Sequence, residues 1–272
     1  MIQLTKFFWV FLFSVTLWLV NGTAGLAASG VESFSPEQMA NSEVLADKAM
    51  AATAAGNLAV AEEYWTEMLD RLPKDAAIWS NRGNVRVSQG KLMAGLEDHN
   101  QAIALAPSVP DAYVNRGIAF EALGRYTEAI ADYNQALSLD PQDPVAYNNR
   151  GNAAAGKGDW QAAVTDYHTA WELAPNFAFA RANWALALYQ TGETEAALTA
   201  LKHIVRKYPK FADARAALTA ALWVEGKIGE AESNWFAAVG LDPRYRDIQW
   251  VAEVRRWPPA MVSALDRFLK LK

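Results

Sequence analysis

The sequence predicts an all-α fold, an α-solenoid built from antiparallel helix pairs. Three observations predict it: a proline that returns every 34 residues, a glycine that returns with the same period, and helix-forming stretches between them. The prolines are Pro73, Pro107, Pro141, Pro175, Pro209 and Pro243, and the glycines are Gly56, Gly90, Gly124, Gly158, Gly192 and Gly226. The prolines phase six repeats, numbered 1 to 6 along the chain: 42–75, 76–109, 110–143, 144–177, 178–211 and 212–245.

Repeat 3 shows how one period is divided. Residues 111–123 are helical in composition, Gly124 can adopt the left-handed conformation that closes a helix, and residues 127–139 form a second helix. Pro141 then stops the second helix, because proline lacks an amide hydrogen and its ring clashes with the preceding turn. Each repeat is therefore expected to be a pair of antiparallel helices.

Small and large residues recur at fixed places within the repeat. The eighth place is glycine in repeats 2 to 4 and the twentieth is alanine in five of the six repeats, which lets the two helices approach closely. The twenty-fourth place carries large side chains, which we expect to fill the space between repeats: Trp65, Tyr133, Tyr167 and Trp235.

Composition and charge narrow the classes of function. The chain has 272 residues, with 25 Lys and Arg against 30 Asp and Glu, and it contains no cysteine. Its mild negative charge disfavours nucleic acid as a partner. The absence of cysteine excludes disulfides and thiolate chemistry.

The N-terminus has the features of an export signal. Lys6 precedes an apolar run of 14 residues, 7–20, and small residues then fit a cleavage site after Ala27. The alternative is an uncleaved leader that tethers the protein to a membrane or contacts it transiently, but the run is shorter than the roughly 20 residues that span a bilayer. We therefore expect a signal peptide at 1–27, a flexible segment at 28–41, and a location in the periplasm or thylakoid lumen.

The repeat residues carry a resemblance. Trp79, Tyr113 or Tyr147 in the first helix, a following glycine, and then Phe120, Ala129, Tyr133 and Pro141 match the pattern of tetratricopeptide repeats over residues 42–245. The chain resembles a tetratricopeptide repeat (TPR) protein. The resemblance implies a right-handed superhelix in which each first helix lines a concave groove. Repeat 1 departs from the pattern with Leu45 and Ala49, and repeats 5 and 6 with Arg181 and Arg215.

Arginine occupies the seventh place of repeats 2 to 4, where the family usually has leucine. A buried cation without a partner would cost several kcal/mol. Aspartate stands at the twenty-third place of the same three repeats and is missing there from repeats 5 and 6. We therefore predict structural ion pairs between the helices of one repeat: Arg82 with Asp98, Arg116 with Asp132, and Arg150 with Asp166. The alternative is that these arginines point into the groove and bind an acidic ligand.

The groove places implied by the resemblance are mostly uncharged. Asparagine recurs at the sixth place, and its amide can both donate to and accept from the backbone of an extended peptide. The alternative is that these amides bond only to neighbouring groups or solvent. Apolar residues would anchor the peptide in the second half. The predicted peptide-binding groove comprises Asn81, Asn84, Asn115, Ile118, Asn148, Asn149, Asn152, Phe179, Asn183, Leu186, Tyr189 and Trp223.

No catalytic motif or cofactor site is recognisable. The histidines His99, His168 and His203 lie at different places of the repeat, without a partner at metal-ligand spacing, so no enzyme activity, metal or cofactor is expected.

Residues 246–272 follow the repeats, and we expect them to form helices that cap the last repeat, although their apolar stripe could instead dock on a membrane or partner. Arg255 and Arg256 are expected to be exposed.

The predicted function is that of an exported scaffold or assembly factor that binds an extended segment of another protein. The alternatives are a self-associating structural repeat protein, whose oligomeric state the sequence leaves open, and a membrane-tethered adaptor.

Overall fold

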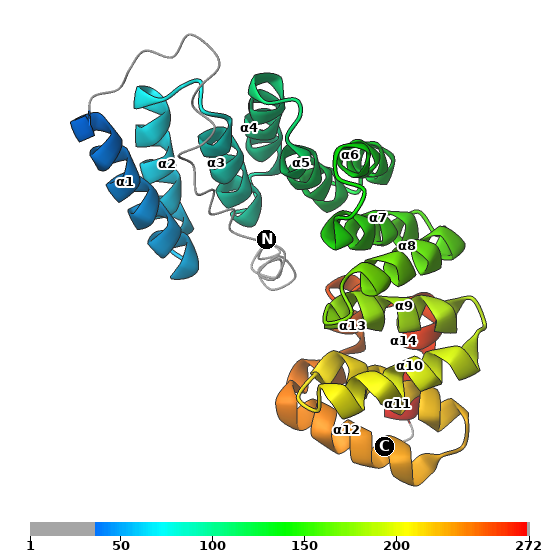
Figure 1. Cartoon of the computed structure of the whole chain (residues 1–272). Coiled ribbons are helices and arrows are strands. Elements are labelled where there is room, and N and C mark those ends of the chain that lie inside the picture. Colours follow the sequence, from blue (N-terminus) through cyan, green and yellow to red (C-terminus); the bar gives the residue numbers. More distant parts are fainter. Residues whose placement is uncertain (1–35, 271–272) are drawn as a thin grey trace. The chain divides into compact units, whose positions relative to one another are not determined.

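The computed structural model describes residues 36–270, which form α-helices and one short 3-10 helix but no strand. The predicted signal peptide lies outside these residues. The helices follow one another in pairs joined by tight turns (Figure 1). Their bounds are α1 (Pro36–Ala54), α2 (Leu58–Arg71), α3 (Ala76–Ser88), α4 (Leu92–Leu105), α5 (Pro110–Ala122), α6 (Tyr126–Leu139), α7 (Pro144–Gly156), α8 (Trp160–Leu173), α9 (Ala178–Gln190), α10 (Thr194–Lys207), α11 (Ala212–Val224), α12 (Ile228–Leu241), η1 (Pro243–Arg246), α13 (Ile248–Glu253) and α14 (Pro259–Lys270). None of the described helices is both long and apolar enough to cross a bilayer.

The periodic glycines and prolines set the helix ends, as predicted. The six periodic glycines lie between the helices of each pair and have positive φ, from 71° at Gly124 to 89° at Gly192. A side chain would be strained in that conformation. Each second helix ends two residues before the proline of its repeat, as α6 does at Leu139 before Pro141. The helix pairs expected from the period are therefore confirmed.

The first helix begins earlier than the sequence suggested. The segment 28–41 was expected to be flexible, but α1 starts at Pro36. Proline suits the first turn of a helix, because the amide hydrogen that it lacks would have no intrahelical partner there. The prediction was wrong for residues 36–41, and residues 28–35 lie outside the described part of the chain.

The chain divides into two compact bodies at the turn inside repeat 3. The N-terminal body runs to Leu123 and holds α1 to α5, and the C-terminal body runs from Gly124 and holds α6 to α14. In the N-terminal body, buried apolar residues of α1, α2 and α3 form one core: Leu45, Ala49, Trp65, Met68 and Ile78 belong to it.

Glycine at the eighth place makes room for a ring within the same repeat. A Cβ atom on Gly83 would lie 2.7 Å from the His99 ring, and one on Gly151 would lie 2.8 Å from the Tyr167 ring. The large residues at the twenty-fourth place were expected to fill space between repeats. At these two positions the ring also packs inside its own helix pair, because glycine lets the first helix approach it, and Tyr167 shares a core with Ala187 and Leu188 of repeat 5 as well.

The C-terminal segment is helical and packs on the last repeat, as predicted, but mainly on its first helix, α11, and not over the outer face of its second. In the C-terminal body, α14 packs against α11 and α9, which are first helices of their repeats. Met261, Leu265 and Phe268 of α14 are fully buried there. We expected a cap on the last repeat helix, α12. Phe268 reaches Trp235 of α12, but Phe236 of the same helix remains 81% exposed.

Candidate functional site

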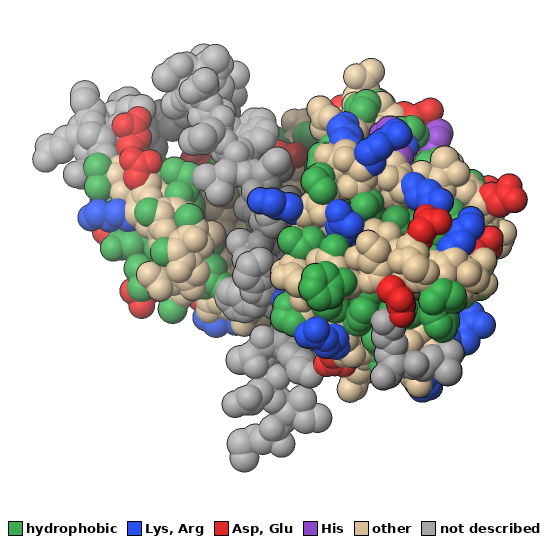
Figure 2. Space-filling view, turned by 90° about the horizontal axis from the view of Figure 1, so that it is seen from below, with side chains coloured by type: hydrophobic (Ala, Val, Ile, Leu, Met, Phe, Trp, Pro, Cys, Tyr) green, Lys and Arg blue, Asp and Glu red, His purple; other side chains and the backbone are tan. Residues whose placement is uncertain are grey.

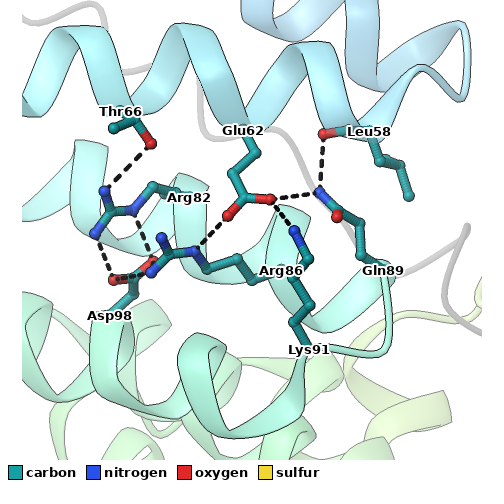
Figure 3. A network of polar contacts seen from close by, with 8 residues as sticks. All are labelled: Leu58, Glu62, Thr66, Arg82, Arg86, Gln89, Lys91 and Asp98. Atoms are coloured by element: carbon teal, nitrogen blue, oxygen red, sulfur yellow. Dashed lines mark hydrogen bonds and ion pairs between the residues drawn. The ribbon is translucent and has the colours of Figure 1, made fainter.

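Arg82 joins three helices of the N-terminal body (Figure 3). From α3, its Nε and Nη2 atoms donate to the two carboxylate oxygens of Asp98 on α4, at 2.9 and 2.8 Å. Its Nη1 atom donates to Thr66 on α2, at 3.3 Å. The ring of Trp79 lies 4.8 Å below the guanidinium carbon. This bidentate pair is the one predicted for repeat 2, and it is buried.

Arg86, which the sequence analysis did not single out, extends this network. It donates to both oxygens of Asp98 at 3.0 Å and to Glu62 of α2 at 2.8 Å. Glu62 also accepts from Lys91 at 2.6 Å and from Gln89 at 2.9 Å. Burial raises the pKa of Glu62, but the hydrogen bonds from Lys91, Arg86 and Gln89 outweigh it and lower that pKa to about 2. Glu62 is therefore ionised and holds α2 to the next repeat.

Repeat 4 contains a second predicted pair. Arg150 on α7 donates to Asp166 on α8 at 2.8 and 2.6 Å, and to Asn134 on α6 at 2.7 Å. In the N-terminal body, Arg116 on α5 donates to Asn100 on α4 at 2.8 Å. Arg116 and Asp132 belong to different bodies, so their pairing stays a prediction.

These contacts place the arginines at the joints between repeats. Each reaches the twenty-fifth place of the preceding repeat, and Arg82 and Arg150 also hold the twenty-third place of their own. In repeat 5, Trp184 replaces the arginine and packs against His168 at the same twenty-fifth place, with ring centroids 4.9 Å apart. The arginines therefore bind the repeats together, and their contacts give no support to the alternative of an acidic ligand.

The asparagines fall into two groups. Asn115 donates to Ser80 at 3.1 Å, and Asn183 donates to Asn148 at 3.1 Å, so both link one first helix to the preceding one. Asn152 accepts from the Tyr167 hydroxyl at 2.9 Å. Asn148 and Asn149 are buried, whereas Asn81 is exposed and Asn84 is half-buried. The alternative interpretation, bonding to neighbours, thus describes Asn115, Asn148, Asn152 and Asn183.

The apolar side chains that we predicted to anchor a peptide in the second half contact other residues of the chain itself. Leu186 is buried in the core that includes α14, and Tyr189 packs against the same core. Trp223 meets Phe268 of α14 edge to face, with centroids 5.3 Å apart. Phe179 meets Phe211 in the same way at 4.9 Å. The chain itself therefore covers Leu186 fully and Phe179, Tyr189 and Trp223 in part, on the first-helix face of repeats 5 and 6 that we had assigned to a partner.

Asp213 fixes this C-terminal segment in place. The carboxylate, buried on α11, accepts from Tyr245 at 2.5 Å, from Arg255 Nε at 2.9 Å and from Trp257 at 3.0 Å. Arg255 Nη2 lies 2.8 Å from the second oxygen. Burial opposes ionisation of Asp213, but Arg255, Tyr245 and Trp257 outweigh it and lower the pKa of the carboxyl. The expectation that Arg255 is exposed was wrong, while Arg256 is exposed.

A further contact ties the start of α14 to α9. The backbone amide of Ala260 donates to the side-chain oxygen of Gln190 at 2.8 Å. The amide lies in the first turn of α14, where a backbone donor has no intrahelical acceptor, so a side chain from another repeat satisfies it.

The open part of the predicted groove lies on α3 and α5. Asn81 and Asn84 are three residues apart on α3, and Asn115 and Ile118 are three apart on α5, so each pair shares one helix face. The bond from Asn115 to Ser80 joins the two faces.

Among residues 36–270, no group of histidine, aspartate and glutamate side chains could hold a metal ion. On the face of the molecule in Figure 2, basic and acidic side chains are interspersed with hydrophobic ones.

Comparison with known proteins agrees with this architecture. Family models described as "TPR repeat" and "Tetratricopeptide repeat" match residues 46–92, 83–124, 119–158 and 154–222. The chain belongs to the tetratricopeptide repeat family. It is 35% identical over 75 residues to tetratricopeptide repeat protein 36 of Bos taurus, an alignment that spans 28% of this chain and 40% of that protein.

Several solved TPR structures share the fold. The chain is similar to YrrB, described as a TPR protein with an unusual peptide-binding site, with a TM-score of 0.54 and 21% identity over 72% of this chain and all of that one. A TPR protein from Parabacteroides merdae ATCC 43184 gives a TM-score of 0.61 and 21% identity over 85% and 86% of the two chains. The Cut9–Hcn1 complex gives 0.68 and 17% identity, over 84% of this chain and 43% of that one. Family and fold are those of a protein–protein interaction scaffold.

Proposed function

We propose that this TPR protein is an exported scaffold that binds an extended segment of another polypeptide on α3 and α5. The observation that supports this most directly is the contrast between the two bodies. Asn81 is exposed and Asn84, Asn115 and Ile118 are half-buried, whereas Leu186 is buried and Tyr189 and Trp223 pack against the chain's own core.

The side chains on α3 and α5 suit a peptide backbone. Each asparagine amide offers two N–H donors and a carbonyl acceptor, so it can pair with the N–H and C=O groups of a chain of any sequence. Packed helices lie about 8–10 Å apart, and an extended chain advances about 3.3 Å per residue. Asn81 and Asn115 would therefore meet about every third residue of the bound segment, Asn115 through its second N–H and its carbonyl oxygen because its other N–H donates to Ser80. Ile118 would lie beside them as an apolar contact.

Export is the part of the proposal that rests on residues 1–27. Their basic start, apolar run and small residues before position 28 favour a cleaved leader and a location in the periplasm or thylakoid lumen. N-terminal sequencing of the protein from its native cell, after fractionation of the compartments, tests this. A start near residue 28 in an exported fraction is expected, and an intact Met1 in the cytoplasmic fraction would contradict it.

The bound segment can be identified by site-specific crosslinking. A photoreactive amino acid at position 81 or 118 should attach to one common segment of one protein in the native cell. Met93, 64% exposed on a second helix, is the control position and should not label that segment. Equal labelling from positions 81 and 93 would contradict a binding face on the first helices.

The amides are then tested on the identified segment as a synthetic peptide. Replacing Asn81 and Asn84 together with alanine removes two hydrogen-bonding side chains, each worth about 1 kcal/mol. The dissociation constant should rise about 30-fold. Gln101→Ala, at an exposed position on α4, is the matched control and should leave binding unchanged. Equal affinity of the double variant and the control would argue against backbone capture by asparagine.

A further inference from the structure

The four joints from repeat 1 to repeat 5 share one contact. The twenty-fifth place, on the second helix of one repeat, contacts the seventh place, on the first helix of the next. The two positions are always 16 residues apart. Within the described residues this contact occurs as a hydrogen bond or a ring contact in the pairs Thr66–Arg82, Asn100–Arg116, Asn134–Arg150 and His168–Trp184.

In the last repeat, the second-helix side of this joint is present, but no first helix of a following repeat packs on it within the described residues. Its twenty-fifth place is Phe236, which is 81% exposed, and Ile228 lies two turns earlier on the same face of α12 and is 41% exposed. A following first helix would cover both. Residues 36–270 do not supply one there, because the residues after α12 turn toward Asp213 and α14 packs on α9 and α11. An exposed phenylalanine at a place that is polar in the other repeats is the unusual feature.

The first repeat presents the second half of the joint. The third place of the first helix is at most 4% exposed in repeats 2 to 6, at Ile78, Ala112, Ala146, Ala180 and Ala214. In repeat 1 that place is Val44, which is 51% exposed. Ala51 at the tenth place is also exposed, whereas its counterparts, such as Val85 and Ala119, are buried.

The seventh place of repeat 1 carries a positively charged side chain, as it does in repeats 2 to 4. Lys48 is exposed, and its ammonium lies 5.9 Å from the ring of Tyr64, the residue at the twenty-third place of its own repeat. Arg82 holds Asp98 at those same two places. A cation at the seventh place can pack over an aromatic ring at the twenty-fifth place of a preceding repeat, and Phe236 is such a ring.

We propose that α12 of one molecule packs against α1 of a second copy and continues the repeat stack head to tail. Lys48 of the second copy lies over Phe236, and Val44 and Ala51 of that copy cover Ile228. A second copy fits this surface because, within residues 36–270, both halves of the joint that the repeats use lie exposed, at Val44 on α1 and at Phe236 on α12. The two faces differ, so the contact is heterologous and adds further copies unless the assembly closes into a ring.

Two single variants test the two faces separately. Phe236→Glu places a charge on the α12 face, and Val44→Glu places one on the α1 face. Both positions are exposed, so far-UV circular dichroism, and Tm at a concentration where the wild type is monomeric, should match those of the wild type. Met93→Glu, at an exposed position on an internal repeat, is the control. The molar mass of each protein is measured by sedimentation velocity and light scattering over a wide range of concentration.

The wild type and Met93→Glu should increase in mass beyond a dimer as concentration rises, whereas each of the other variants alone should stay monomeric. An equimolar mixture of Phe236→Glu and Val44→Glu should form dimers and nothing larger, because each retains one intact face. A monomeric wild type would overturn the proposal. So would a Val44→Glu variant that still associates, which would indicate a symmetric contact between two α12 faces, or a mixture that stays monomeric.

Discussion

His99 provides a sharp test of how the repeats are packed. The ring is fully buried at the twenty-fourth place of repeat 2, and neither of its nitrogens has a hydrogen-bond partner. Burial, together with the nearby charge of Arg116, lowers the pKa of His99 from 6.5 to about 3. Repeat 4 has Tyr167 at the same place, and its hydroxyl donates to Asn152 at 2.9 Å. Repeat 2 has an asparagine, Asn84, at the equivalent ninth place.

Two substitutions separate the two effects of His99. His99→Phe removes the titrating group, and His99→Tyr also offers Asn84 the hydrogen bond that Tyr167 makes. Each orphaned nitrogen costs about 1–3 kcal/mol, and a new hydrogen bond contributes about 1 kcal/mol. Both variants should therefore be more stable than the wild type at pH 7, and the tyrosine variant should exceed the phenylalanine variant by about 1 kcal/mol.

The pH dependence gives a second and larger signal. A base whose pKa falls on folding binds its proton only in the unfolded chain, so the folded state loses stability as pH drops through 6.5 and continues to lose it down to about 3. One pKa unit corresponds to about 1.4 kcal/mol, so the loss reaches several kcal/mol. Neither variant has this slope.

Urea unfolding of the three proteins at a series of pH values between 7 and 3 measures both signals. Other carboxylates and histidines titrate in the same range, so the difference between wild type and variant is the informative curve. A difference that stays constant with pH would refute the placement of His99 as a buried neutral ring. A tyrosine variant less stable than the phenylalanine variant would refute the equivalence of repeats 2 and 4.

Three further predictions concern the ion pairs. Asp213→Ala removes the ion-pair partner of Arg255, whose side chain is 17% exposed, so it should cost about 3 kcal/mol. It should also speed hydrogen exchange in α14 and α9 above that of other helices, and uniform exchange would contradict a local effect of Asp213. Arg150→Leu should destabilise the protein, because it leaves the charge of Asp166 uncompensated. Adding Asp166→Asn gives the leucine–asparagine pairing that repeat 6 has, and it should recover most of the loss in a double-mutant cycle. Strictly additive costs would argue against the pair. Glu62→Gln should lower the free energy of unfolding at pH 7 by about 1 kcal/mol after solvent screening. Because the pKa of Glu62 is lowered to about 2, this difference from the wild type should vanish as pH falls from about 4.5 toward 2. A difference that persists at pH 2 would contradict an ionised Glu62.

The local signals predicted the repeats well because they act over a few residues. A glycine with positive φ and a proline two residues after a helix end are local constraints, so the period of 34 residues located every turn. The pairs Arg82–Asp98 and Arg150–Asp166 could also be inferred, because the same two places change together from repeat to repeat. The start of α1 was missed because residues 36–41 lie outside that periodic pattern.

The site was harder to predict because its contacts are distant in sequence. Asp213 meets Tyr245, Arg255 and Trp257, which lie 32 to 44 residues later, at or beyond the end of repeat 6. An aspartate among the alanines of α11 was the available signal, but it does not identify its partners. The assignment of Leu186, Tyr189 and Trp223 to a partner failed for the same reason, because a family pattern describes repeats and not the segment that covers them.

The position of α14 also means that α9 is synthesised well before the helix that packs on it. Ala260 bonds to Gln190, 70 residues earlier in the chain. The apolar face of α9 therefore leaves the ribosome long before the helix that shields it has been translated. Over that interval the nascent chain presents an uncovered hydrophobic surface, which is where a chaperone would be needed.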